Sequence, residues 1–213
     1  WAISGGQSSR HTNLSTLRNT TVAVSRLGSG SHIMAFVVAD QQGWLDPAAA
    51  TEPFNRFESL QNFKAMRDAV NGEQADFFMW ETFMTKPYHD SGELKRLGEI
   101  TPPWPAFSIA ARRDLIARKG EDLRRALAAV DQATALFVAE RDGRSVDLVV
   151  ERLGHDREDV RSWFKTVSYP AKSVGVSRAA LEVTLETLRK AGVVEREVVV
   201  EELVDTSVAR LDA

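Results

Sequence analysis

The chain has 213 residues, of which 43% are hydrophobic and 27% charged, as in an ordinary globular protein. Its net charge of −3 argues against nucleic acid as the main partner, because such proteins usually carry a clustered basic face. The absence of cysteine excludes disulfides, thiolate metal sites and cysteine nucleophiles, and no apolar run reaches the roughly 18 residues of a membrane span. No signal peptide is visible; because the chain starts at Trp1, we expect a further N-terminal part, and the compartment stays unknown.

The first half of the chain alternates predicted strands and helices. β-branched or short apolar runs predict the strands, and amphipathic runs that end at glycine predict the helices. The end of a strand is predicted at 1–3, further strands at 20–27, 54–59, 75–80 and 94–100, and helices at 32–42, 60–72 and 81–93. This alternation predicts a mainly parallel sheet with helices on its faces.

The second half is predicted to be almost entirely helical. Residues 101–107 contain three prolines in four positions and cannot be regular structure, whereas 108–117 is predicted to begin as a strand. Helices are predicted at 121–141, 146–154, 157–167 and 177–194, followed by an extended tail at 196–205. Ser177 is the expected N-cap of the last helix and Gly192 its stop.

The strongest candidate site is the turn Gly28-Ser29-Gly30-Ser31-His32. It joins a strand to a helix, and its two glycines let the backbone approach a ligand closely. Serine hydroxyls and the first helix amides supply donors, and the helix dipole favours negative charge there. The turn fits neither the phosphate loop GxxxxGK[ST] nor the dinucleotide pattern GxGxxG. The alternative is a well-capped helix after a tight turn.

Three further residues are candidates for the same site. Trp80 and Glu81 end a predicted strand, and in open α/β sheets ligands bind at the carboxyl edge. Trp104 lies in the proline-rich connector, where it could stack on a ligand. The alternatives are that Trp80 is a core residue, that Glu81 complements a helix dipole, and that Trp104 is a packed hinge residue.

The histidines do not form a metal-binding pattern. No HxH, HExxH or paired-carboxylate spacing is present, so no metal and no cofactor are predicted. We interpret His11, His89 and His155 as solvated loop residues, and only His32 lies in the candidate site. A superficial helix-turn-helix at 144–164 carries acidic residues that would repel phosphates, so DNA binding is not predicted.

Several of these segments together resemble a known family. "NLSTLRNTTVAVSRLGSGSHIMAFVVADQQGW", "DAVNGEQADFFMWETF" and "WPAFSIAARRDLIARKG" are similar to the type 2 periplasmic-binding proteins, in particular the branch for nitrate, aliphatic sulfonates and thiamine precursors. The combination looks closest to a group known chiefly from fungi. The resemblance spans about Leu14 to Val194, and its motifs are specific for the fold rather than for the ligand.

The resemblance implies an α/β fold of two lobes with a helical C-terminal part. Residues 20–104 would form the second lobe, and 1–19 with 105–213 the remainder of the first lobe, whose initial βαβ units are missing from this sequence. A ligand would lie between the lobes. It would be held by Ser25 and the Gly28–His32 turn, with Trp80, Glu81 and Trp104 nearby.

The function expected from the residues and the resemblance is binding of a small polar or anionic solute, or of a thiamine-precursor-like compound, without catalysis. One alternative is an enzyme of the thiamine-pyrimidine synthase kind, with His32 and Glu81 as acid–base groups; its cysteine-rich iron motif has no counterpart here. Another is the effector-sensing domain of a transcription regulator. A transporter partner and the oligomeric state are left open.

Overall fold

The structure, a computed structural model, describes residues 1–45, 52–105 and 107–212. The contacts divide the chain into two units: Trp1–Pro103 with Thr184–Arg196, and Trp104–Val183 with Glu197–Ala213. Each unit is described by itself.

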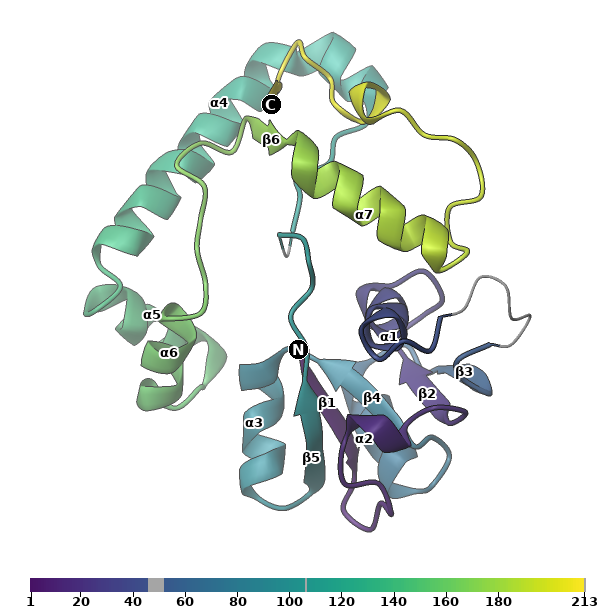
Figure 1. Ribbon diagram of the computed structural model, residues 1–213. Coiled ribbons are helices and arrows are strands. Elements are labelled where there is room, and N and C mark those ends of the chain that lie inside the picture. The colour runs from purple at the N-terminus through teal and green to yellow at the C-terminus, as the bar shows by residue number, and fades with distance from the viewer. Residues whose placement is uncertain (46–51, 106, 213) are drawn as a thin grey trace. The chain divides into compact units, whose positions relative to one another are not determined.

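The first unit is built on a five-stranded sheet with the order β3-β2-β4-β1-β5 (Figure 1). β2 is parallel to β3 and to β4, whereas β1 is antiparallel to both of its neighbours, β4 and β5. Four strands therefore run in one direction and β1 runs against them. The strands are β1 (Ala2–Gly6), β2 (Thr21–Val24), β3 (Arg56–Ser59), β4 (Phe77–Trp80) and β5 (Leu94–Glu99), and the helices of the unit's first 103 residues are η1 (Leu14–Thr16), α1 (Gly30–Gln41), α2 (Phe63–Asn71) and α3 (Thr82–Asp90).

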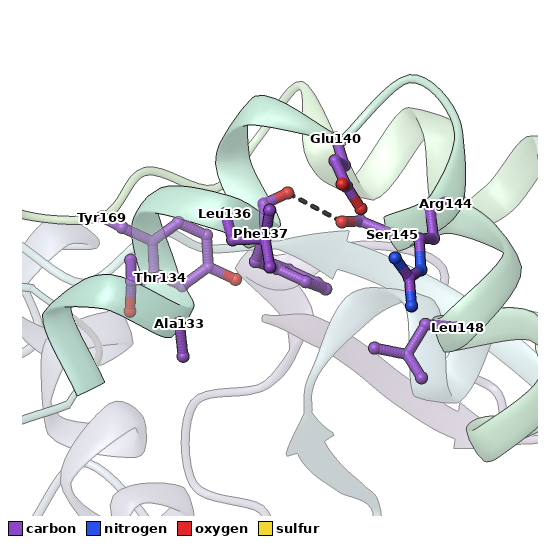
Figure 2. Close-up of a pocket in the computed structure, with 9 residues that line it drawn as sticks. All are labelled: Ala133, Thr134, Leu136, Phe137, Glu140, Arg144, Ser145, Leu148 and Tyr169. Atoms are coloured by element: carbon purple, nitrogen blue, oxygen red, sulfur yellow. Dashed lines mark hydrogen bonds between the residues drawn. The ribbon is translucent and has the colours of Figure 1, made fainter. Parts of the chain in front are cut away.

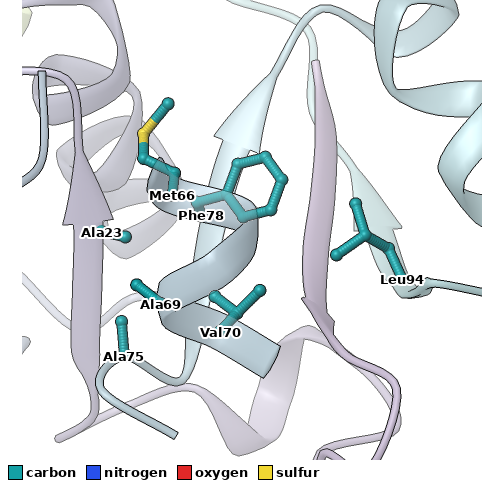
Figure 3. Packing of buried hydrophobic residues seen from close by; sticks show 7 residues of the cluster. All are labelled: Ala23, Met66, Ala69, Val70, Ala75, Phe78 and Leu94. Atoms are coloured by element: carbon teal, nitrogen blue, oxygen red, sulfur yellow. The ribbon is translucent and has the colours of Figure 1, made fainter. Parts of the chain in front are cut away.

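Alternation along β4 separates the two faces of this sheet. Phe78 contacts Phe63 of α2, and it belongs to a buried cluster with residues of α2, β2 and β5 (Figure 3). Phe77, one residue earlier, lies on the other face, where its ring centroid is 5.7 Å from that of Phe54. Phe54 contacts Phe57, which in turn contacts Phe36 of α1. α2 thus covers one face and α1 the other. The cluster comprises Ala23, Met66, Ala69, Val70, Ala75, Phe78 and Leu94.

The second unit is mainly helical. Its elements are α4 (Arg113–Ala139), α5 (Arg144–Leu153), α6 (Arg157–Phe164), β6 (Gly175–Ser177), the first part of α7 (Arg178–Lys190), η2 (Val200–Leu203) and β7 (Arg210–Asp212). Val146, Val149, Val160 and Phe164 form a small core between α5 and α6. The short strands β6 and β7 pair in parallel.

The α/β class with a mainly parallel sheet is confirmed, but some local predictions were wrong. Residues 107–112 do not form a strand, and α4 begins at Arg113, eight residues before the predicted start. Non-helical angles at Lys119 (φ −139°, ψ 33°) mark a kink, which explains why the helical pattern seemed to begin only after it. The tail at 196–205 contains the 3-10 turn η2 instead of a continuous extended segment.

The expected lobes and the observed units differ in where the first residues belong. We expected 1–19 outside the 20–104 lobe, yet β1 pairs with β4 and β5 inside the same sheet as β2. Short apolar strands give no sign of their partner, so only the topology places β1. Among the described ranges, every helix is too short or too polar to cross a bilayer.

Candidate functional site

Three helices begin at the same edge of the sheet in the first unit. β2, β3 and β4 are parallel, and each is followed by a helix whose first turn lies at the carboxyl ends of the strands (Figure 1). The N-caps are Ser29 for α1, Asn62 for α2 and Glu81 for α3, and each side chain accepts a hydrogen bond from its own helix. This edge therefore gathers the positive ends of three helix dipoles.

Three serines connect the end of β2 to the start of α1. The Ser31 hydroxyl accepts a hydrogen bond from the Ser25 backbone N–H at 3.0 Å, and it lies 3.3 Å from Ser25 Oγ and 2.9 Å from Ser29 Oγ. Ser29 and Ser31 are buried and Ser25 is half-buried. The hydroxyls thus bond to one another and fix the turn, and Ser25 is the member nearest the surface.

His32 also has a structural partner. Its Nδ1 accepts a hydrogen bond from the Gly28 N–H at 3.1 Å, and its ring packs edge-on against Phe57 and Phe36. Gly28 has φ +76°, a left-handed conformation that disfavours residues with a Cβ. Burial lowers the pKa of His32 below its ordinary value of 6.5.

Two backbone donors at the start of α1 have no partner in the described part of the chain: the N–H groups of Gly30 and Ser31. The next two amides, of His32 and Ile33, donate to the Ser29 carbonyl at 3.0 Å each. A helix start leaves such donors for water or a ligand. The predicted turn therefore has two backbone N–H donors available to a ligand, whereas most of its side-chain polar atoms already form hydrogen bonds within the turn.

Trp80 takes part in an aromatic group that extends from this edge onto the α2 face. Its ring stacks on Phe63 with centroids 5.5 Å apart and an angle of 20°, and it meets Trp1 edge-on at 6.4 Å. Trp80 is half-buried and packs against the cluster of Figure 3. Trp80 is therefore partly a core residue, in agreement with the alternative interpretation. Because its ring is also partly exposed, contact with a ligand stays a prediction.

Glu81 accepts a hydrogen bond at 2.7 Å from the Met84 backbone N–H and so caps α3. An acid–base role for Glu81 and His32 would require groups that both already hold the backbone in place. Trp104 is half-buried and belongs to the second unit. Its part in a ligand site stays a prediction.

Three residues at the edge were missed from the sequence. Asn62 caps α2 through a hydrogen bond from the Ala65 N–H at 2.9 Å, and the strand–Asn–helix pattern could have indicated it. Trp1 lies against Gly30 and Trp80, which no local pattern could show. Arg26 is an exposed cation a few residues before the two unpartnered amides in the sequence, and it was not predicted as part of the site.

A hollow in the second unit was not predicted. It has a volume of about 570 Å³ and lies between the end of α4, the start of α5 and Tyr169 (Figure 2). Phe137 and Leu148 provide apolar walls, Glu140 and Arg144 carry opposite charges, and Ser145 Oγ donates to the Phe137 carbonyl at 2.8 Å. Burial raises the pKa of Tyr169. None of the residues predicted for the ligand site lines it.

A second, smaller cleft in the first unit contains a histidine that was wrongly predicted to be solvated. It measures about 300 Å³ and is lined by 8–11 and by Val70, Glu73, Ala75 and Asp76. His11, interpreted from the sequence as solvated, is only 5% exposed and lies 3.3 Å from Asp76. The same interpretation was wrong for His89, which lies in α3, is half-buried, and has its Nε2 3.0 Å from Ser4 Oγ. Within the described ranges, no three histidine, cysteine or acidic side chains come together as metal ligands would.

Comparisons with known proteins agree with this fold. Residues 1–100 match the family described as Ca3427-like PBP. Among solved structures, the chain is similar to the CA3427 gene product of Candida albicans, which has the generic periplasmic-binding-protein fold. The identity is 29% and the TM-score 0.85, over 100% of this chain and 71% of that one.

Two sulfonate-binding proteins share the fold at lower identity. The periplasmic aliphatic sulphonate-binding protein SsuA of Escherichia coli is 17% identical with a TM-score of 0.63, over 95% of this chain and 64% of that one. SsuA of Xanthomonas axonopodis pv. citri, an alkanesulfonate-binding protein solved with MOPS, is 15% identical with a TM-score of 0.66, over 95% and 68%. No curated protein sequence matches the chain.

The sheet order, the helix starts at its carboxyl edge and these similarities define a protein of the periplasmic-binding-protein fold. The resemblance inferred from the residues is thereby confirmed. Within that fold, the first 100 residues match the Ca3427-like family, and the structure of the Candida albicans protein is similar over the whole chain.

Proposed function

We propose that the protein binds a small anionic solute at the carboxyl edge of the five-stranded sheet, where α1 begins. The observation that carries the proposal is the pair of unpartnered amides of Gly30 and Ser31. They stand at the positive end of a helix, where an anion is favoured. The relation in fold to proteins named for sulfonate binding makes an organic sulfonate the first class to test.

Charge along the edge limits where the anion would lie. Glu81 follows β4 and Glu99 ends β5, so the β4–β5 side carries carboxylates. Glu99 is paired with Arg96, which reduces its effect. Arg26 and the amides of α1 lie on the β2 side. We therefore place the anionic group over the Ser25–His32 turn, with Trp80 available to the rest of the ligand.

Thermal shift measurements test the proposal. The protein would be heated with MOPS, short alkanesulfonates, sulfate, nitrate and simple carboxylates in turn. A ligand at about 100 times its Kd should add about 2.7 kcal/mol to the free energy of unfolding. Absence of a shift with every anion would contradict the proposed function.

A matched pair of variants locates the site. Ser31→Ala removes a buried hydroxyl at the α1 turn, and Ser145→Ala removes a buried hydroxyl in the second unit. Both should lower stability, because each removes buried hydrogen bonds. Of these two variants, only Ser31→Ala should also weaken anion binding. Arg26→Gln should weaken anion binding without a loss of stability. Equal affinity in Ser31→Ala and Ser145→Ala would mean that the turn is only a helix cap.

A further inference from the structure

The 300 Å³ cleft of the first unit lies at the opposite edge of the sheet from the proposed anion site. Asp76 directly precedes β4, and its Oδ2 accepts a hydrogen bond at 2.8 Å from the N–H of Thr21, the first residue of β2. Since β2 and β4 are parallel, both begin at this edge. An inference about this cleft therefore stands independently of the proposed function.

The hydrogen bonds around His11 fix the proton on one ring nitrogen. Thr16 Oγ1 donates its only proton to the Asn13 carbonyl at 2.8 Å, and it lies 3.0 Å from His11 Nδ1. The threonine oxygen must therefore accept from a protonated Nδ1. In the neutral imidazole, Nε2 is then an acceptor. Arg10 Nε donates to this Nε2 at 3.5 Å, which agrees with that assignment.

Two acceptors consequently face each other in the cleft. Asp76 Oδ1 lies 3.3 Å from His11 Nε2, and both carry lone pairs when the imidazole is neutral. In this neutral form of the imidazole, the contact is favourable only when an N–H donor serves both atoms. Arg10 approaches one of them at the long limit of a hydrogen bond, so the position is filled incompletely by the chain itself. Glu73 adds a second carboxylate to the lining.

The rest of the lining defines the body of a suitable ligand. Val70 and Ala75 are buried members of the cluster in Figure 3 and also line the cleft, so they provide an apolar side. The volume stands at the lower end of the roughly 300–1,000 Å³ that is typical of ligand pockets. The cleft thus combines acceptors, negative charge and an apolar wall in a small space.

We propose that this cleft is a binding site for a small aliphatic amine, a cation with a primary ammonium or guanidinium group. An ammonium carries three diverging donors and serves His11 Nε2 and Asp76 Oδ1 at once. Hydrogen bonds from a charged donor to a carboxylate are the stronger kind. The methylene chain of the ligand lies against Val70 and Ala75, and the ammonium displaces the Arg10 guanidinium.

Isothermal titration of the whole protein tests this with agmatine as the probe, which has an ammonium, a guanidinium and a short methylene chain. Tetramethylammonium is the matched control, because it has the same charge per cationic group and no N–H donor. Agmatine should bind and tetramethylammonium should not. Equal binding of both ions, or no binding of agmatine, would overturn the proposal.

Variants of the two carboxylates test whether the negative charge of the cleft binds the ligand. Asp76→Asn should lower the affinity for agmatine at least about tenfold, the loss expected for one charge-assisted hydrogen bond. Because Asp76 also holds Thr21, the exposed Glu73→Gln serves as a second variant that leaves the fold intact, and it should weaken agmatine as well. Unchanged affinity in Glu73→Gln and Asp76→Asn would overturn the proposal.

Removal of Arg10 gives the sharpest result. Arg10→Ala should tighten agmatine, because it removes the internal cation that competes for His11 Nε2. Weaker binding of agmatine in Arg10→Ala would show that Arg10 supports the ligand instead of competing with it, and would overturn the proposal. Ser31→Ala, at the opposite edge, should leave agmatine binding unchanged, so that failure of the anion site and failure of this cleft are distinguished.

Discussion

The indole of Trp1 lies against the α-carbon of Gly30. A Cβ built on Gly30 would stand 3.1 Å from Cη2 of Trp1, closer than such carbons normally approach, and 3.4 Å from Cζ2. Glycine at the first position of α1 therefore permits a tryptophan from β1's amino end to lie across the helix start. This contact joins the predicted turn to Trp80, which meets Trp1 edge-on.

Gly30→Val should displace the Trp1 ring and weaken anion binding at the same edge. Overpacking of this kind costs about 1–3 kcal/mol of stability. Denaturant unfolding would measure the stability and thermal shift with MOPS the binding. The double variant Trp1→Ala with Gly30→Val should recover most of the stability, because it removes the atoms that clash. Equal losses in the single and double variants would show that the clash is not with Trp1.

Trp80→Ala should lower stability by about 2–3 kcal/mol, less than the 3–5 kcal/mol of a fully buried aromatic residue. The ring is half-buried, and it stacks on Phe63 with the centroids 5.5 Å apart. Trp80→Phe keeps an aromatic ring that can stack on Phe63, so it should lose much less stability. Chemical denaturation would compare the three proteins. A loss of affinity in Trp80→Phe with nearly normal stability would indicate that the indole itself contacts the ligand.

Glu81→Ala should cost about 1 kcal/mol, because the Met84 N–H loses its cap. Glu81→Gln keeps a carbonyl oxygen in the same place and should retain most of the stability. If Glu81 were a catalytic acid or base, Glu81→Gln would be as damaging to activity as Glu81→Ala. Thermal unfolding of the two variants therefore tests the capping role, and equal losses of stability in Glu81→Gln and Glu81→Ala would contradict it.

Local patterns were enough to predict β2 to β5 and α1 to α3 of the first unit, whereas β1 was predicted only at 1–3 and η1 was not predicted. Ser29 and Gly43 bracket α1 as N-cap and as the left-handed residue after its end, and Gly72 ends α2. Those signals come from neighbouring residues, so the sequence contains them. The same holds for the turn at Gly28, whose φ of +76° requires the conformational freedom that glycine has.

Long-range contacts could not be predicted in this way. The burial of His11 depends on Asp76, 65 positions away in the sequence, and the position of Trp1 depends on Gly30. The pairing of β6 with β7 joins segments more than thirty residues apart. None of these partners leaves a periodic or capping signal. The two hollows, which are lined by such contacts, were missed for the same reason.

The stability of the protein should fall as the pH decreases below about 6.5, the ordinary pKa of histidine. Burial lowers the pKa of His32 and of His89, and for His89 the charge of Arg96 lowers it further while Asp90 opposes the change. The folded state therefore disfavours the charged imidazoles, and the unfolded state binds more protons. The contribution of these groups is fully present above pH 6.5 and is lost as the pH falls through their lowered pKa values.

Two variants separate this effect from the titration of carboxylates, which begins at lower pH. His32→Asn keeps an acceptor for the Gly28 N–H, and His89→Gln keeps a polar partner for Ser4. Thermal unfolding between pH 5 and 8 should show a shallower pH dependence in the double variant than in the unaltered protein, since two groups that favour the unfolded state when protonated are gone. An identical slope in both proteins would mean that other groups dominate, because removal of the two imidazoles would then change no proton uptake.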